Sequence, residues 1–336
     1  MREIPLHDIR TAATAIYDLV VRTPLIRLEV PDAFAERLAG SEILLKLETL
    51  QPIGSFKIRG AHNTVRQMSA GELSDGVWTV SAGNAAQGVA LAARHAGVPC
   101  SVMVMDTAPR TKIDAIRRLG ATIVPATYDE CWATVEAHGS PRMRGMFVHP
   151  FDDDRFIAGN GTIGVEILED LPDVDAVVGA MGGGGLLGGV ASAIRAVRPE
   201  VQIFAAEPET AAPLQTSFQN GRASRFEAWQ PSFVDGAGGR SVLPTMWPLL
   251  ERLITGSIVV SLPEIAAAMA LVAQRCRVIA EGAAACAVAA ALTGRARGRI
   301  VAIVSGGNID LSKFASLVGA CPAEHEDAEA RRLRAL

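Results

Sequence analysis

The strongest constraint on the fold is a repeated pattern, in which a short β-branched run leads into a small-residue turn and then into an alanine-rich helical stretch. Alternating strands and helices predict a doubly wound α/β protein with parallel strands. Because ligands bind at the carboxyl ends of such strands, a site is expected at the turns that follow them. Strands are predicted at residues 77–80, 100–104, 121–124, 175–180, 201–205 and 299–304.

Length and composition favour a folded protein of two domains that binds small molecules. The chain has 336 residues, whereas one domain usually holds about 100–200. Hydrophobic residues make up 49% of it and charged residues 20%, so most of the chain is expected to fold compactly. The net charge of -4 gives no electrostatic reason to bind nucleic acid or an anionic membrane. A short charged tail around 324–334 is interpreted as a frayed or helical end.

The cysteines and the N-terminal segment favour a cytoplasmic protein. The five cysteines are scattered and form no C-x-x-C pair, so reduced thiols are predicted rather than disulfides or a zinc site. They are Cys100, Cys131, Cys276, Cys286 and Cys321. The N-terminus lacks the apolar core of a signal peptide. No stretch reaches the roughly 18 consecutive apolar residues that a membrane span needs.

One lysine occupies an unusual position, in the segment QPIGSFKIRG at residues 51–60. The apolar residues that follow lie on one helical face, so Ser55 is predicted as the N-cap and Lys57 falls in the first turn. The helix dipole and the apolar neighbours both favour the neutral amine, which is the form that an imine-forming lysine requires. The alternative is a lysine whose ammonium group reaches water. Arg59 could support the loop electrostatically, but it is interpreted by default as an ordinary surface charge.

A run of four glycines follows the strand at 175–180 and precedes a helix. Backbone N–H groups at a helix N-terminus form a phosphate-binding geometry. The run also satisfies G-x-G-x-x-G from Gly183 to Gly188, and Glu207 ends the next strand, as a nicotinamide or flavin site requires. The glycines alone would favour that dinucleotide site.

Two further turns favour a different cofactor. SAGN at 81–84 and SGGN at 305–308 each follow a predicted strand and offer a hydroxyl and an amide. Either could be an ordinary polar turn. Together with Lys57, they describe a lysine, a phosphate cradle, an amide and a neutral hydroxyl around one flat cofactor. A dinucleotide site does not need this combination.

At this point a resemblance becomes specific. The motifs GSFKIRGAHN, SAGNAAQGVA, IAGNGTIGVEI, GGGGLLGG, AAEPE, VDG and VSGGNID occur in the order seen in fold-type II pyridoxal-phosphate enzymes. The chain resembles the threonine/serine dehydratase and serine racemase group. The resemblance implies the tryptophan synthase β-like α/β fold with two doubly wound open-sheet domains. It implies a large domain at 1–73 and 151–336, and a small inserted domain at 74–150.

The resemblance also assigns roles by position. The cofactor, pyridoxal 5'-phosphate (PLP), would be held by Phe56, Lys57, Asn84, Gly182, Gly183, Gly184, Gly185, Gly236 and Ser305. The substrate would be bound by Ser81, Ala82, Asn84 and Ala85, with Lys57 and Ser81 catalytic. Lys57 would carry the cofactor as an imine and remove the α-proton. The serine hydroxyl at 305 cannot hold a full positive charge on the ring nitrogen, which favours elimination over transamination.

Some positions depart from the group's pattern. Racemases of the group carry a serine where this chain has Ala82, so racemisation is disfavoured. Ala85 replaces a histidine common in the dehydratases, so the substrate pocket is expected to be roomier. Glu207 and the carbonyl of Ala211 match two cation ligands of the racemases, but the third position is Pro213, so a solvated glutamate that caps a loop is preferred and no metal is predicted. A metal cluster at His149 with the carboxylates of 152–154 is weighed below a solvated face or a helix cap.

The sequence therefore predicts β-elimination of L-threonine, L-serine or a related β-hydroxy amino acid, giving a 2-oxo acid and ammonia. A homodimer is expected from the resemblance. Other reactions of the same cofactor, β-replacement or racemisation, stay open as alternatives. So do a nicotinamide-dependent oxidoreductase and a binding protein without turnover.

Overall fold

The larger of two sheets has the strand order β1-β2-β10-β7-β8-β9 in the computed structural model, which describes residues 2–319. All pairs are parallel except β1 with β2. The strands are β1 (Leu25–Arg27), β2 (Glu42–Leu47), β7 (Ala176–Ala180), β8 (Gln202–Pro208), β9 (Gly256–Val260) and β10 (Arg299–Val304). The α/β class predicted from the alternating pattern is confirmed.

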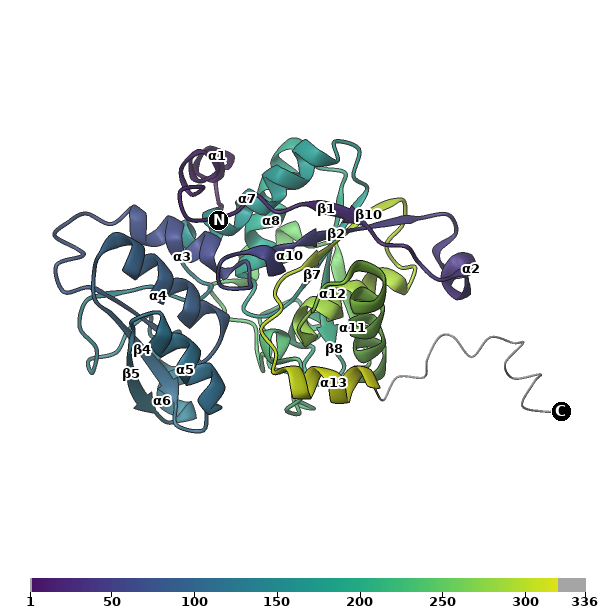
Figure 1. Ribbon diagram of the computed structural model, residues 1–336. Helices are drawn as coiled ribbons and strands as arrows, with labels where there is room; N and C mark the ends of the chain where they lie inside the picture. Colours follow the sequence, from purple (N-terminus) through teal and green to yellow (C-terminus); the bar gives the residue numbers. More distant parts are fainter. Residues whose placement is uncertain (1, 320–336) are drawn as a thin grey trace.

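The smaller sheet is entirely parallel and lies to the left in Figure 1. Its order is β5-β4-β3-β6. The strands are β3 (Val77–Val80), β4 (Cys100–Met105), β5 (Thr122–Ala126) and β6 (Met146–Phe147). We propose that the two sheets belong to the two expected domains, at 1–73 with 151–336 and at 74–150. The proposal is supported by the position of all four small-sheet strands within the second range.

Helices flank both sheets (Figure 1). Their bounds are α1 (Leu6–Ala15), α2 (Ala35–Leu38), α3 (Lys57–Arg66), α4 (Asn84–Ala96), α5 (Arg110–Arg118), α6 (Tyr128–Glu136), α7 (Asp154–Asp170), α8 (Gly185–Val197), α9 (Pro213–Asn220), α10 (Trp247–Leu253), α11 (Leu262–Cys276), α12 (Gly282–Leu292) and α13 (Leu311–Gly319). Short 3-10 turns lie at Asp32–Phe34, Glu48–Leu50 and Asp235–Ala237. The charged tail at 324–334 and Cys321 lie outside the described residues.

Two apolar cores cover the two faces of the larger sheet. Side chains alternate along each strand, so Val177 packs with α7 and α8, whereas its neighbour Val178 packs with α11 and α12. Every residue of α12 is buried, as expected of a helix that is apolar all round. Because these strands are buried on both faces, they read as continuous apolar runs. This rigid sheet fixes where its carboxyl ends lie.

Several elements differ from the sequence predictions or were missed by them. The sequence analysis identified neither β1, β2 and β9 nor α1 and α6. α6 begins with a capping box, in which Thr127 accepts from the backbone of Glu130 and the Glu130 side chain reaches back. The sequence predicts a helix at about 158–168, whereas α7 begins at Asp154, because Asp153 caps it by accepting from the Phe156 N–H.

The interpretation of Arg59 as a surface charge is wrong. Its side chain is fully buried and bonds to Glu48 at 2.8 Å and to Glu166 at 2.6 Å. Lys46, also fully buried, lies 2.6 Å from the same Glu166. The hydrophobic positions of α3 could not predict the burial of Arg59, because the ion-pair network depends on side chains from β2 and α7. The network fixes α3 against the larger sheet and so fixes Lys57 at its start.

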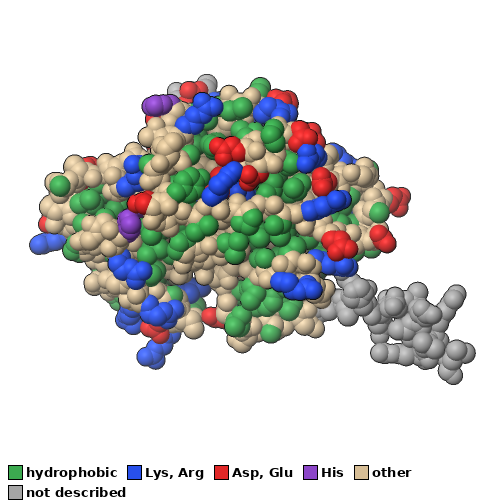
Figure 2. All heavy atoms as spheres, turned by 45° about the horizontal axis from the view of Figure 1, so that its top comes forward, with side chains coloured by type: hydrophobic (Ala, Val, Ile, Leu, Met, Phe, Trp, Pro, Cys, Tyr) green, Lys and Arg blue, Asp and Glu red, His purple; other side chains and the backbone are tan. Residues whose placement is uncertain are grey.

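The surface and the thiols carry few special features. On the face shown in Figure 2, acidic and basic side chains are interspersed over much of the surface. Among the described residues, Cys100, Cys131, Cys276 and Cys286 are free thiols. Within residues 2–319, no helix is both long and apolar enough to cross a membrane.

Candidate active site

Lys57 is the first residue of α3, and its amine lies in apolar surroundings. The Nζ atom donates a hydrogen bond to the carbonyl oxygen of Pro150 at 2.5 Å. The ring centroids of Phe56 and Phe156 lie 5.2 and 5.4 Å from it. Desolvation lowers the pKa of Lys57 to about 8, so a larger part of the amine is neutral near neutral pH than for an ordinary lysine. Ser55 is not the N-cap as predicted, because Phe56 occupies that position and the Ser55 hydroxyl instead accepts from the Lys57 N–H.

The glycine run connects β7 to α8 and leaves no room for side chains. A Cβ on Gly183 would lie 2.2 Å from the ring of Phe151, and one on Gly185 would lie 2.6 Å from the carbonyl oxygen of Phe151. Gly184 has φ +92° at the N-cap of α8, a conformation that favours glycine. A Cβ on Gly182 would lie 2.5 Å from the carbonyl of Gly236. The loop therefore accepts only glycine, and its backbone N–H groups lie at the positive end of a helix.

An amide and a carboxylate connect three elements at the same edge. The Nδ2 atom of Asn84 donates to Glu281 at 2.8 Å, and the Oδ1 atom of Asn84 accepts from Asn308 at 2.7 Å. Glu281 is the N-cap of α12 but makes no side-chain cap bond, because its carboxylate reaches Asn84 instead. Desolvation raises the pKa of Glu281 to about 7.

The turns after β3 and β10 lie where the sequence predicts. Ser81 follows β3, and its hydroxyl accepts from the Gly83 N–H at 3.1 Å at the start of α4. Ser305 follows β10 and is buried, and its carbonyl accepts from the Phe56 N–H at 3.0 Å. Ala82 is partly exposed and Ala85 is buried. The hydroxyl of Ser81 and the first N–H groups of α4 thus share one turn.

These predicted residues form one contiguous site. Pro150 contacts Lys57, and its neighbour Phe151 packs on the glycine loop. On the other side, a Cβ on Gly306 would lie 2.9 Å from both the Glu281 carboxylate and the Cβ of Ser55. The site therefore brings together Phe56, Lys57, Ser81, Asn84, the glycine loop, Gly236 and Ser305. Their individual roles stay predictions.

Sequence reasoning missed some residues of this site. Pro150, Phe151 and Phe156 come from a segment interpreted only as a polar loop and helix start. Asn308 was noted in its turn without a role. Glu281 had a detectable signal, because glutamate is a poor N-cap and stands directly before an alanine-rich helix.

Glu207 is fully buried, so it is not the solvated glutamate that the sequence favoured. Both oxygens of Glu207 accept hydrogen bonds, from the N–H groups of Leu214 and Gln215 and from the Ser257 hydroxyl. Burial raises the pKa of Glu207 to about 7. Ala211 is also buried, and its N–H donates to Pro208.

The group at 149–154 is partly a helix cap, as preferred from the sequence. Asp153 caps α7. The side chains of His149, Asp152 and His138 lie close together, and Asp152 also bonds to Arg2.

The residues present fit PLP. A phosphate group needs an open set of backbone donors, and the glycine loop is packed so tightly on Phe151 that a single Cβ would disrupt it. The aldehyde of the cofactor needs a neutral amine, and the desolvated Lys57 offers one. A lysine amine beside a glycine cradle, at the carboxyl ends of open parallel sheets, defines a fold-type II PLP enzyme.

The comparisons agree with this class. Residues 16–306 match the family model described as pyridoxal-phosphate dependent enzyme, and the chain belongs to that family. PLP is therefore its cofactor, and the nicotinamide alternative is wrong. An L-threonine ammonia-lyase of Thermotoga maritima is 40% identical over 319 residues, 94% of this chain and 78% of the relative.

Two solved structures are similar over nearly their full lengths. Maize serine racemase has a TM-score of 0.86 and 29% identity, and the match covers 99% of each chain. The processed form of threonine deaminase isoform 2 from Solanum lycopersicum has a TM-score of 0.81 and 33% identity, and the match covers 95% of each chain. The expected fold and family are confirmed.

Proposed function

We propose that the protein converts L-threonine, L-serine or a related β-hydroxy amino acid to a 2-oxo acid and ammonia. The water lost with the β-hydroxyl is regained when the product is hydrolysed, so the net products are the oxo acid and ammonia. The similarity to threonine ammonia-lyases supports this reaction. The observation that carries the proposal is the desolvated amine of Lys57 beside the glycine cradle.

Lys57 is proposed to remove the proton from the α-carbon at its Nζ atom. When bound, PLP draws electrons from that carbon and so lowers the cost of removing the proton. A base works best when its pKa lies near the working pH, and the pKa of Lys57 is about 8. The Pro150 carbonyl and the two phenyl rings restrict where this amine points.

The remaining residues are proposed to bind and orient. Phe56, Asn84, Gly236 and Ser305 would contact the ring of the cofactor, and the four glycines from 182 to 185 would hold its phosphate. Ser81, Ala82, Asn84 and Ala85 would bind the substrate. The N–H groups at the start of α4 support this, because the positive end of a helix attracts a carboxylate. Ser305 favours elimination, since a hydroxyl stabilises a charged ring nitrogen less well than a carboxylate does.

The test is a spectrum followed by an activity assay. The purified protein should absorb as a lysine-bound PLP enzyme, lose that band on borohydride reduction, and release 2-oxo acid from L-threonine or L-serine. Lys57→Ala should lose turnover by several orders of magnitude. Lys313→Ala, at an exposed lysine of α13, should keep it. Full activity in folded Lys57→Ala would overturn the proposal.

Racemisation is the second candidate, because maize serine racemase has the same fold at 29% identity. Ala82 argues against it, since this methyl group cannot exchange a proton with the α-carbon. Chiral chromatography of the serine that remains during turnover separates the two. D-serine accumulating faster than pyruvate would favour the racemase.

The oligomeric state, the location and the class of substrate are also part of the proposal. The resemblance supports a homodimer, and gel filtration with light scattering tests its mass. The scattered cysteines favour reduced thiols and so a cytoplasmic location. Small amino-acid substrates agree with the names of the relatives.

A further inference from the structure

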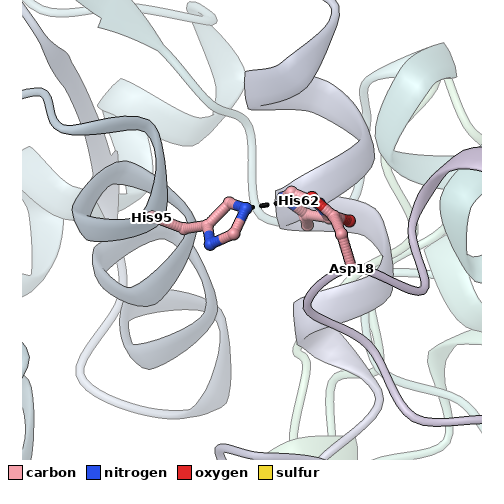
Figure 3. Close-up of side chains that lie close together, drawn as sticks. All are labelled: Asp18, His62 and His95. Atoms are coloured by element: carbon pink, nitrogen blue, oxygen red, sulfur yellow. Dashed lines mark hydrogen bonds and ion pairs between the residues drawn. The ribbon is translucent and has the colours of Figure 1, made fainter.

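Three ligand-type side chains from three separate segments lie close together. Asp18 follows α1, His62 lies in the middle of α3, and His95 lies in the last turn of α4. The Nε2 atom of His62 lies 2.8 Å from Oδ1 of Asp18, and the Nε2 atom of His95 lies 2.9 Å from Oδ2. Figure 3 shows His95 directed from its helix toward the other two side chains. The two imidazole rings are 5.2 Å apart and nearly perpendicular.

The geometry points to a site for one divalent transition-metal ion, of which zinc is the type, held by Asp18, His62 and His95. One ligand atom from each residue lies within 4.8 Å of the others, so a small inward rotation places all three around one ion. Two imidazoles and one carboxylate form a donor set suited to zinc and its neighbours in the periodic table. Calcium and magnesium prefer oxygen ligands alone.

The hydrogen bonds of the two imidazoles already direct their Nε2 atoms at one carboxylate. Each imidazole bonds to a carboxylate oxygen, which can only accept, so each Nε2 carries the proton that a metal ion would replace. The three side chains therefore converge without any change of fold.

The exposure of the three groups leaves room for an ion to enter. The side chain of His62 is 4% exposed, which fixes its position, whereas those of His95 and Asp18 are 40% and 54% exposed. A buried ligand with two more accessible ones gives three protein ligands and an outward position for water. Within residues 2–319, the other such group, at His138, His149 and Asp152, already has Arg2 bonded to its carboxylate. That cation competes with a metal, so the Asp18 group is the better site.

A metal here would tie together the two helices that begin at the active site. α3 begins at Lys57, and α4 begins at Asn84. The helices pack closely, since a Cβ on Gly88 of α4 would lie 3.0 Å from the carbonyl of Lys57. An ion bound by His62 and His95 would add a bridge between them and to the segment after α1. We therefore expect metal binding to raise the melting temperature, whether or not substrate turns over.

The test measures zinc binding to the PLP-loaded, chelator-treated protein, by calorimetry with zinc chloride and by inductively coupled plasma analysis. We expect about one zinc ion per chain, bound at this site. A hundredfold excess of zinc over its Kd should raise the melting temperature by roughly 3 °C. His95→Gln and Asp18→Asn should each weaken binding at least about tenfold. Both positions are exposed, so these variants should fold.

His138→Gln is the matched control, because it removes a histidine from the other group and should leave binding unchanged. Cobalt(II) added to the wild type should give the visible absorption of a low-coordinate site, and His95→Gln should abolish it. The proposal is overturned if the wild type binds no zinc, if His95→Gln binds it as tightly as the wild type, or if His138→Gln removes the binding. Because binding is measured directly, these outcomes do not depend on the catalysed reaction.

Discussion

The amide of Asn84 donates a hydrogen bond to the carboxylate of Glu281 at 2.8 Å, although 197 residues separate the two in sequence. The bond joins the first residue of α4 to the residue before α12, and Asn308 extends it to the turn after β10. The start of α4, where substrate is proposed to bind, is thereby fixed to the larger sheet. The same environment desolvates Glu281 and raises its pKa to about 7.

The raised pKa of Glu281 predicts a pH dependence of stability. Since this pKa is about 7 when folded and 4.5 otherwise, folding favours the protonated acid. The stability that the protonated Glu281 contributes to the folded state is therefore fully present below about pH 4.5, and it is lost as the pH rises through 7. Glutamine does not ionise, so the Glu281→Gln variant should not lose this stability. Between pH 5 and pH 8, its urea midpoint should therefore rise relative to that of the wild type. Glu251→Gln, at an exposed glutamate, should follow the wild type; a constant difference for Glu281→Gln would contradict the prediction.

Lys57 predicts how fast the cofactor-free protein captures PLP. Only the neutral amine attacks an aldehyde, and with a pKa of about 8 its fraction rises about fivefold between pH 7 and pH 8. Stopped-flow absorbance at saturating PLP should show that increase and then level off above pH 9. A rate that keeps rising tenfold per pH unit up to pH 10 would indicate an amine with the ordinary lysine pKa. Lys57→Ala should show no absorbance change of this kind.

The buried network at Arg59 predicts a large loss of stability when the guanidinium is removed. Arg59→Met leaves Glu48 without the cation that it contacts at 2.8 Å, so the free energy of unfolding should fall by about 3–5 kcal/mol. Arg142→Met is the matched control. Its ion pair with Glu130 is 45% exposed on both sides, and its loss should cost less than about 1 kcal/mol. Equal urea midpoints for the two variants would contradict this account.

The contrast between Lys57 and Arg59 illustrates what the sequence could predict. The glycine run and the turns after β3 and β10 follow strands whose apolar runs are visible in the sequence, so their position at the carboxyl ends of strands followed from topology, whereas Lys57 was found from its own place in a helix start. Arg59 stands two residues away and was misinterpreted, because its partners come from distant segments. A local sequence pattern cannot show which distant side chains form ion pairs with each other. Glu281 and Phe151 were missed for the same reason, because they belong to the site through contacts between distant segments.

The strands at the edges of the larger sheet show the same limit. β1 has three residues, and β9 begins with glycine and serine and has only three β-branched residues, so both are shorter apolar runs than β10. Their pairing depends on neighbouring strands that are already in place. The inner strands β7, β8 and β10 were predicted from apolar runs because both their faces are buried, whereas the inner strand β2 was missed because Lys46 interrupts its apolar run.

Gly183 provides the most direct test of the phosphate cradle. A Cβ at this position would lie 2.2 Å from the Phe151 ring, so in Gly183→Ala either the loop or the ring must move. The N–H groups of the loop would lose their alignment, and PLP affinity should fall at least about tenfold, measured by fluorescence titration of the cofactor-free protein. Gly139→Ala is the control, because a Cβ there meets nothing within 4 Å.

If the clash with Phe151 is the cause, shortening that ring should relieve it. In Gly183→Ala with Phe151→Ala, part of the lost affinity should return, so the two changes should be non-additive by at least about 0.5 kcal/mol in a double-mutant cycle. Phe151→Ala alone should weaken binding, because the loop loses the surface on which it packs. Additive effects would mean that Gly183 is required for another reason, such as direct contact of its backbone with the phosphate. The double variant therefore separates packing of the loop from contact with the ligand.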